Sequence, residues 1–331
     1  MTPLLDVPLL EVRGLQAHLH LRRGVLRAVD GVDLRLDEGQ TLGLVGESGS
    51  GKTMTGLSLL RLLPRPAGRI AGGSIRLDGE ELTALSERSM ARTVRGRRIA
   101  MIAQDPMTAL NPVFSIGDQV AQPFRNHGAA RGLRSGRRLW GAVADVLRQV
   151  RIPSPERRLG DYPHQFSGGQ RQRVATAMAI APAPRLLIAD EPTTALDVTV
   201  QAQVIALLRR IQADTGAGII LITHDLGVAA SLCHRIAVMY AGRVVEDGPV
   251  REIYHRPAHP YTQALLAAVP RVGVRTRRLL AIPGQPPSML ALPPGCRFAP
   301  RCPRRMPACD EYPPTLPAGA GHVAACWLLQ R

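Results

Sequence analysis

The stretch Gly46-Glu-Ser-Gly-Ser-Gly-Lys-Thr53 decides the fold class of this sequence. It matches the pattern G-x-x-x-x-G-K-[ST] and lies between an apolar run at 41–46 and a helical pattern at 54–63, the context that this motif requires. Glycines in such a turn let backbone N–H groups face phosphate oxygens, and the following helix N-terminus adds its dipole. The sequence therefore predicts a phosphate-binding loop made of these residues: Gly46, Glu47, Ser48, Gly49, Ser50, Gly51, Lys52 and Thr53.

Lys52 is the single lysine of the chain, beside 41 arginines. A lysine ammonium is a compact point charge that can reach the β- and γ-phosphates of a nucleotide, whereas an arginine guanidinium is a wide planar fork. Lysine at this one position indicates a tight site that does not accept arginine. The hydroxyl of Thr53 is the group that such a loop offers to Mg²⁺.

Length and composition limit the number of domains and the class of protein. The chain has 331 residues, enough for about two domains of roughly 150 residues each, and 45% of them are hydrophobic and 21% charged. These values exclude a disordered, collagen-like or coiled-coil chain. No apolar run reaches the ~18 residues of a membrane helix and no secretion signal is present, so we expect a cytoplasmic protein. The net charge of +16 leaves three explanations open: a nucleic acid, a membrane surface or simple enrichment in arginine.

Short apolar runs alternate with helical patterns along the chain. Four runs are nearly continuous in apolar residues: 41–46, 98–103, 185–190 and 218–223. Such runs are typical of parallel strands that are covered on both faces, and residues 200–213 have helical spacing. Strands that alternate with helices predict an α/β layered core.

Other regions depart from this alternation. Antiparallel strands are predicted at 10–20, 28–36 and 74–77, and a hairpin at 237–247 that turns at Ala241-Gly242. Residues 105–165 predict a mostly helical insertion, with one helix near 139–150. From residue 249 onward the chain is rich in proline and carries 11 arginines against three acidic residues, about half of the excess charge.

A pair of carboxylates follows the apolar run at 185–190. Asp190 ends this predicted strand, where its carboxylate can help to hold Mg²⁺. Glu191 comes next and is well placed to polarise a water molecule for attack on a γ-phosphate. Two adjacent carboxylates after a buried strand therefore favour a catalytic site over a merely solvated acidic pair.

Four further motifs complete a family likeness. Phe166-Ser167-Gly168-Gly169-Gln170 resembles the signature motif of the ATP-binding cassette (ABC) ATPases, and Gln104 resembles their Q-loop glutamine. Ala195-Leu196-Asp197 resembles the D-loop, and His224 resembles the switch histidine. With the phosphate loop and the Asp190-Glu191 strand, all six motifs occur in the family's order within about residues 10–250.

The resemblance implies the P-loop NTPase fold of an ABC cassette, with a RecA-like core, an antiparallel β subdomain and a helical subdomain. The cassette would span residues 1–250, with the helical insertion at about 105–180, and a C-terminal extension would span 251–331. It further implies that the cofactors of the site are ATP and Mg²⁺.

The resemblance also implies a role for each motif. Gln104 and Asp190 would support Mg²⁺, Glu191 would be the general base, and His224 would orient the γ-phosphate and the attacking water. In the family, the signature residues contact ATP bound by a partner subunit, so a chain with one cassette must dimerise. Those residues are Ser167, Gly168, Gly169 and Gln170, and Asp197 belongs to the D-loop.

Longer stretches narrow the likeness to the ATPases of dipeptide and oligopeptide importers. The similar stretches are Gln104-Asp-Pro-Met-Thr-Ala-Leu-Asn-Pro112, Thr193-Thr-Ala-Leu-Asp-Val-Thr-Val-Gln-Ala-Gln203, His259-Pro-Tyr-Thr-Gln-Ala-Leu-Leu266 and Ile282-Pro-Gly-Gln-Pro-Pro287. This family implies a peripheral protein on the cytoplasmic face of the membrane that drives peptide uptake. Its partners would be a second, identical or similar ATPase, two transmembrane permease subunits and an extracytoplasmic peptide-binding protein.

Four of the five cysteines fall in the last 36 residues, and in a cytoplasmic chain such clusters indicate metal or cluster ligands before disulfides. The resemblance implies that they bind a [4Fe–4S] cluster; they are Cys296, Cys302, Cys309 and Cys326. A four-thiolate zinc site and an unligated tail remain alternatives, although zinc ribbons favour cysteine pairs two to four residues apart. We expect Cys233 to be a small, buried apolar residue.

Two residues depart from the family pattern, and two other functions are possible. Leu26 and Ala103 stand where the family usually has aromatic residues, so we expect adenine to pack on aliphatic surface or on Arg27. The same kind of ATPase subunit would also suit an importer of nickel or another small solute. The basic charge suggests a nucleic-acid-associated ABC ATPase, but the chain has no tandem second cassette and no long heptad insertion, so we expect no nucleic-acid partner.

Overall fold

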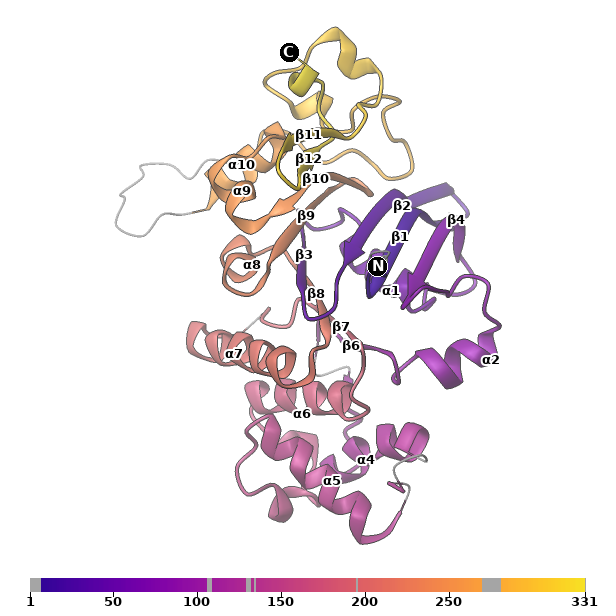
Figure 1. Cartoon of the computed structure of the whole chain (residues 1–331), viewed down its shortest axis with the longest axis vertical. Coiled ribbons are helices and arrows are strands. Elements are labelled where there is room, and N and C mark those ends of the chain that lie inside the picture. Colours follow the sequence, from indigo (N-terminus) through magenta and orange to yellow (C-terminus); the bar gives the residue numbers. More distant parts are fainter. Residues whose placement is uncertain are drawn as a thin grey trace, which may run out of the picture. The chain divides into compact units, whose positions relative to one another are not determined.

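The computed structural model describes residues 7–105, 109–128, 132–133, 135–194, 196–269 and 281–330. The chain forms two compact units (Figure 1). Unit 1 comprises Met1–Leu36, Thr41–Thr83 and Ile222–Arg331, and unit 2 comprises Asp37–Gln40 and Ala84–Leu221. No helix among the described residues has both the length and the apolar character needed to cross a bilayer.

An antiparallel sheet opens unit 1, with the strand order β2-β1-β4-β5. Its strands are β1 (Leu10–Leu21), β2 (Gly24–Leu36), β4 (Gly68–Leu77) and β5 (Glu80–Glu81). Leu10 pairs with Leu36 of β2 and with Leu77 of β4, and the leucines of this row are buried. The predicted antiparallel strands are confirmed, although the last of them begins six residues before the expected position.

The second set of strands in unit 1 carries the C-terminal part of the chain at its edge. In order these strands are β11 (Leu316–Gly319), β12 (His322–Ala324), β10 (Arg243–Pro249), β9 (Arg235–Tyr240) and β3 (Thr41–Val45). β3 runs parallel to β9, while β10 pairs antiparallel with both β9 and β12. The β9–β10 hairpin turns at Ala241 and Gly242 as predicted, with both φ angles positive, as a type I′ turn requires.

The described part of unit 1 also contains four helices and three short 3₁₀ turns. The helices are α1 (Lys52–Leu59), α8 (Leu226–Leu232), α9 (Val250–His255) and α10 (Pro260–Ala268). The 3₁₀ turns are η5 (Ala299–Arg301), η6 (Pro307–Asp310) and η7 (Trp327–Gln330). One buried cluster joins β9, α8 and α10 to Phe298 of the C-terminal tail. The tail therefore packs into the same core as the strands that follow the phosphate loop.

Unit 2 combines parallel strands with a helical bundle. Its strands are β6 (Ile99–Ile102), β7 (Leu186–Asp190) and β8 (Gly218–Thr223), in the order β8-β7-β6. Its helices are α2 (Glu87–Ser89), α4 (Ile116–His127), α5 (Gly136–Gln149), α6 (Gly168–Ile180) and α7 (Val198–Thr215). Shorter turns are the π-helical η1 (Met90–Val94) and the 3₁₀ segments η3 (Pro155–Arg158) and η4 (Pro163–Gln165).

Helices occupy much of the segment for which a helical insertion is predicted. α4 and α5 lie within the predicted segment and pack on each other and on α6 (Figure 1). Ser115 begins α4 by accepting the backbone N–H of Asp118 at 3.1 Å, which satisfies one of the N–H groups left free in a first turn. β7 is fully buried along its length, which explains its nearly continuous apolar sequence.

Candidate nucleotide-binding site

The phosphate loop joins β3 to α1 and depends on two glycines for its shape. A Cβ atom on Gly46 would lie 2.2 Å from the carbonyl oxygen of Met239, closer than any side chain permits. Gly51 has φ +105°, and its Cβ would lie 2.3 Å from the carbonyl oxygen of Ala28. Both positions therefore require glycine, because the loop runs directly against neighbouring backbone.

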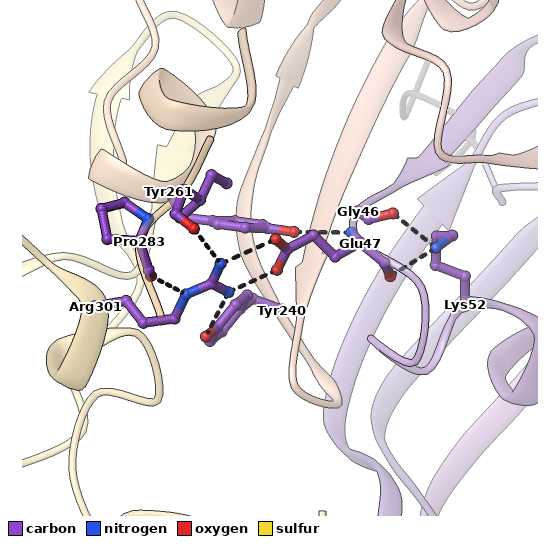
Figure 2. Close-up of polar contacts among 8 residues, drawn as sticks. Gly46, Glu47, Lys52, Tyr240, Tyr261, Pro283 and Arg301 are labelled. Atoms are coloured by element: carbon purple, nitrogen blue, oxygen red, sulfur yellow. Dashed lines mark hydrogen bonds and ion pairs between the residues drawn. The ribbon is translucent and has the colours of Figure 1, made fainter. Parts of the chain in front are cut away.

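Lys52 points back into the loop from the first turn of α1 (Figure 2). Its Nζ donates to the carbonyl oxygens of Gly46 at 2.7 Å and Glu47 at 3.0 Å, and the residue is buried. The hydroxyl of Ser50 is also buried, and no hydrogen-bond partner is found for it among the described residues. A buried ammonium and an unmatched hydroxyl at a helix N-terminus are suited to phosphate oxygens.

Glu47 is fixed by the C-terminal part of the chain, which the sequence did not predict. Its carboxylate forms a two-pronged ion pair with Arg301, with Nη1–Oε2 at 2.7 Å and Nη2–Oε1 at 3.1 Å (Figure 2). Its backbone N–H donates to the hydroxyl oxygen of Tyr261 at 2.8 Å. Burial raises the pKa of the Tyr261 hydroxyl, which stays protonated at neutral pH.

Unit 2 carries the second group of predicted site residues. Asp190 is the buried last residue of β7, and Glu191 follows it with φ +44°. Gln104 Nε2 and Thr194 Oγ1 both donate to Glu191 Oε2, at 3.1 and 2.8 Å. The structure thus brings Gln104 to Glu191, a contact that the sequence motifs did not predict.

The signature and D-loop residues occupy helix N-termini of unit 2. Ser167 and Gln170 form a capping box at the start of α6: each side chain accepts the other residue's backbone N–H. Asp197 caps α7 by accepting the N–H of Val200 at 2.9 Å. A Cβ on Gly169 would lie 2.8 Å from the Val200 side chain, so α6 and α7 approach closely there.

The remaining motif residues belong to different parts of the chain. His224 follows β8 in unit 1 and is exposed. Arg27, on β2, is exposed, and Leu26 beside it is partly exposed. Ala195 of the D-loop stretch and residues 106–108 of the Q-loop stretch lie outside the described residues.

Family comparison decides the class of the protein. Residues 29–194, which include the phosphate loop and the Asp190-Glu191 strand, match the family described as "ABC transporter". Residues 245–309 match "Oligopeptide/dipeptide transporter, C-terminal region".

The chain belongs to the ABC transporter ATP-binding family. As an ABC ATPase it hydrolyses ATP to drive transport. Curated relatives include a probable peptide ABC transporter ATP-binding protein of Sinorhizobium fredii, 49% identical over 96% of this chain and 94% of the relative. A dipeptide transport ATP-binding protein of Bacillus subtilis is 46% identical over 96% of this chain and 94% of its own.

Solved structures confirm the ABC cassette fold. A dimeric cassette in a post-hydrolysis state, bound to ADP and Pi, matches with a TM-score of 0.64 and 26% identity. The match covers 73% of this chain and 99% of that cassette. The protein cbiO1 of Clostridium perfringens, part of the ABC transporter complex cbiONQ, matches with a TM-score of 0.63 and 25% identity. The match covers 76% of this chain and 92% of cbiO1.

The four C-terminal cysteines of this ABC ATPase line one small cavity. They are Cys296, Cys302, Cys309 and Cys326, and His259, Phe298 and Trp327 also line it. Burial raises the pKa of the Cys296 thiol to about 11 and lowers the pKa of His259 to about 3, so both are neutral at pH 7. Within the described ranges, no group of three or more His, Cys, Asp or Glu side chains could hold a metal ion as it stands.

Two arginines of the cysteine-rich tail are buried. The side chains of Arg297 and Arg301 are 6% and 4% exposed, and Arg297 forms an ion pair with Asp30 and donates to the Ala241 carbonyl. Their position between Cys296 and Cys302 was the only sequence signal that could have singled them out.

Cys233 is less buried than expected. It is partly exposed rather than fully buried, although its sulfur packs beside Gly43, where a Cβ would lie 2.9 Å from Sγ. Burial still raises the pKa of its thiol to about 12. The thiol is therefore protonated at neutral pH and has little nucleophilic character.

Proposed function

We propose that this ABC ATPase energises the uptake of dipeptides or oligopeptides across the cytoplasmic membrane. The observation that carries the ATP half of the proposal is the phosphate loop, with Lys52 buried inside it and two glycines that no other residue can replace. The peptide half is supported by the match of residues 245–309 and by relatives named for peptide import.

In this proposal the phosphate loop holds the nucleotide. Backbone N–H groups of residues 46–53 and the Lys52 ammonium bind phosphate oxygens, and the Thr53 hydroxyl binds Mg²⁺. Asp190 and Gln104 add oxygen ligands for the ion. The whole ATP-binding set is Gly46, Glu47, Ser48, Gly49, Ser50, Gly51, Lys52, Thr53 and Gln104.

Glu191 acts as the general base and His224 as an orienting group. The Glu191 carboxylate accepts a proton from water as the water oxygen attacks the γ-phosphorus and the bond to ADP breaks. Gln104 and Thr194 donate to one oxygen of this carboxylate, which fixes its direction. His224 orients the γ-phosphate and the water.

The active form is a dimer of ATPase subunits, identical or similar. The helix N-terminus at Ser167, Gly168, Gly169 and Gln170 would bind the ATP of the partner, with Asp197 beside it. Two permease subunits in the membrane and an extracytoplasmic binding protein complete the transporter, which places this chain at the cytoplasmic face. The capping box at α6 supports the first point only in that it fixes the start of this helix, whose N-terminal end carries the partial positive charge that attracts phosphate.

Cys296, Cys302, Cys309 and Cys326 would hold a [4Fe–4S] cluster. Four thiols that line one cavity match the ligand number of such a cluster, and the apolar wall would exclude water. When bound, the cluster would tie together three separate turns of the tail.

Uptake and composition measurements test the proposal. Cells that lack the gene should regain uptake of labelled dipeptides with the wild-type protein and its permeases, but not with Lys52→Ala. Uptake of nickel instead of peptide would overturn the substrate assignment. Anaerobically purified protein should contain iron and sulfide, and stoichiometric zinc without iron would reject the cluster.

A further inference from the structure

Arg301 connects the cysteine-rich tail to the phosphate loop, although 254 positions separate it from Glu47 in the sequence (Figure 2). The residue is the last of the η5 turn and directly precedes Cys302. Its side chain is only 4% exposed. A buried charge of this kind is stable only when its hydrogen bonds are fully satisfied.

The hydrogen bonds of Arg301 use its entire donor set. Nη1 donates to Glu47 Oε2 at 2.7 Å and to the Tyr240 hydroxyl at 3.2 Å. Nη2 donates to Glu47 Oε1 at 3.1 Å and to the Ile282 carbonyl at 3.3 Å, and Nε donates to the Pro283 carbonyl at 2.9 Å. Five N–H groups thus meet five acceptors, an arrangement that lysine, with three donors and no planar fork, cannot reproduce.

Glu47 is held at three points at once. Arg301 holds its carboxylate, the Tyr261 hydroxyl accepts its backbone N–H, and Lys52 donates to its backbone carbonyl. In Figure 2 the carboxylate and the carbonyl of Glu47 point in different directions, toward Arg301 and Lys52 respectively. The residue therefore links the tail to the lysine that the phosphate site depends on.

The segment that carries Arg301 is itself fixed by packing and by a buried ion pair. Phe298 packs against Tyr240 and Tyr261, with ring centroids 5.3 Å apart in both pairs. Arg297 is buried and forms an ion pair with Asp30 on β2. A segment that is fixed at Arg297 and Phe298 can hold the phosphate loop in place through Arg301.

We propose that Arg301 is a positioning residue for nucleotide binding: through Glu47 it holds the phosphate loop in the conformation that receives phosphate groups. The proposal rests on the assignment of this loop to ATP made above. A loop that samples several conformations binds more weakly in proportion to the fraction that is competent. We call the ion pair between Arg301 and Glu47 the brace. Loss of the brace should therefore raise the dissociation constant of ATP and leave the chemical step nearly unchanged.

A double-mutant cycle in the full-length protein tests this role. We expect Arg301→Gln and Glu47→Gln each to raise the ATP dissociation constant about tenfold, as for loss of a hydrogen-bonded charged group. The double variant should bind ATP no more weakly than whichever single variant has the lower affinity for ATP. Both changes remove the same interaction, the ion pair between Arg301 and Glu47. KM for ATP should rise in parallel while kcat stays within about twofold.

Three further variants keep the outcome interpretable. Arg305→Gln removes a neighbouring arginine whose ion pair with Asp310 is exposed, and it should leave ATP binding unchanged. Arg301→Lys keeps the charge and should recover only part of the affinity. Lys52→Ala tests the site itself: if it binds ATP normally, the ATP assignment of the loop is wrong.

Suppose that Lys52→Ala loses ATP binding while Arg301→Gln and Glu47→Gln bind ATP within twofold of wild type. The positioning role of Arg301 is then refuted, and the ATP assignment of the loop still holds. Fully additive losses in the double variant would refute it as well. If Arg301→Gln does not fold, Glu47→Gln and Arg301→Lys carry the same comparison.

Discussion

Glu47 and Glu191 are two carboxylates of the same predicted site, and the structure holds them in different ways. Glu47 faces a buried guanidinium that neutralises its charge through two hydrogen bonds. Glu191 receives one amide and one hydroxyl donor on a single oxygen. A carboxylate bound to a fixed cation serves as a structural anchor, whereas we propose that the Glu191 carboxylate accepts a proton from water.

The largest effect should follow from removing the base. Glu191→Gln should lower kcat about 10²- to 10⁴-fold, the typical contribution of a general base, because the amide cannot accept the proton of water. Steady-state phosphate release measures the loss. The matched control is Glu47→Gln, in which kcat should stay near wild type. Near-normal hydrolysis by Glu191→Gln would remove the functional difference between the two carboxylates.

The buried ion pair beside the brace should matter mainly for stability. Arg297→Gln leaves Asp30, which is 9% exposed, without its closest cation, and such a change destabilises proteins by about 3–5 kcal/mol. Urea unfolding at pH 7 measures it, with the exposed Arg305→Gln as control at no more than about 1 kcal/mol. Equal losses in both variants would show that burial of the pair has no effect.

The same pair predicts a direction for the effect of pH. Burial opposes ionisation of Asp30, but the charge and hydrogen bond of Arg297 outweigh it and lower the pKa of Asp30 below its usual range. A lowered folded-state pKa stabilises the fold above the unfolded-state pKa, and this stabilisation disappears as the pH falls through the folded-state value. The difference in the free energy of unfolding between wild type and Arg297→Gln should therefore become smaller as the pH falls.

Gln104 should have a smaller effect than the base that it contacts. Gln104→Ala removes an amide hydrogen bond to the Glu191 carboxylate; because the contact is exposed, we take the lower end of the range for a charged acceptor, about 1.5 kcal/mol, so kcat should fall about tenfold. Part of the loss should appear as a raised requirement for Mg²⁺, because Gln104 is also a proposed ligand of the ion. A titration with Mg²⁺ separates the two contributions; an unchanged kcat at every Mg²⁺ concentration would contradict both.

The smallest effect should come from removing the [4Fe–4S] cluster that we propose for the four cysteines. Cys296 and Cys302 end the segment that carries Arg301, so a chelator should loosen the brace and raise the ATP dissociation constant about threefold. This lies below typical allosteric couplings because the Phe298 contacts and the Arg297 ion pair remain. The same treatment of Arg301→Gln should change little, and an equal change in both proteins would contradict the link.

The sequence predicted most of the fold because its signals are local. An apolar run followed by Gly46 and Lys52 specifies a strand, a turn and a helix within about 20 residues, and β3, α1 and the β9–β10 hairpin form where expected. Asp190 and Glu191 at the end of β7 were predictable for the same reason. The four cysteines were also identifiable, because their side-chain chemistry is rare in the chain.

The contacts of Arg301, Tyr261 and Gln104 could not be predicted in this way. Each depends on tertiary structure: Arg301 meets Glu47 only after the tail folds back onto β9 and the phosphate loop. In a chain with 41 arginines, no feature of composition separates two buried arginines from the exposed ones. The only indication in the sequence that these two arginines are buried was their position between Cys296 and Cys302.

The most direct measurement compares Glu47→Gln with Glu191→Gln in two assays, ATP affinity and turnover at saturating ATP. We expect opposite results for the two variants: Glu47→Gln should bind ATP about tenfold more weakly with nearly normal kcat, and Glu191→Gln should bind ATP normally with kcat at least about 10²-fold lower. If Glu47→Gln instead loses turnover at saturating ATP while its affinity for ATP is unchanged, Glu47 does not anchor the phosphate loop and the proposed role of Arg301 is wrong.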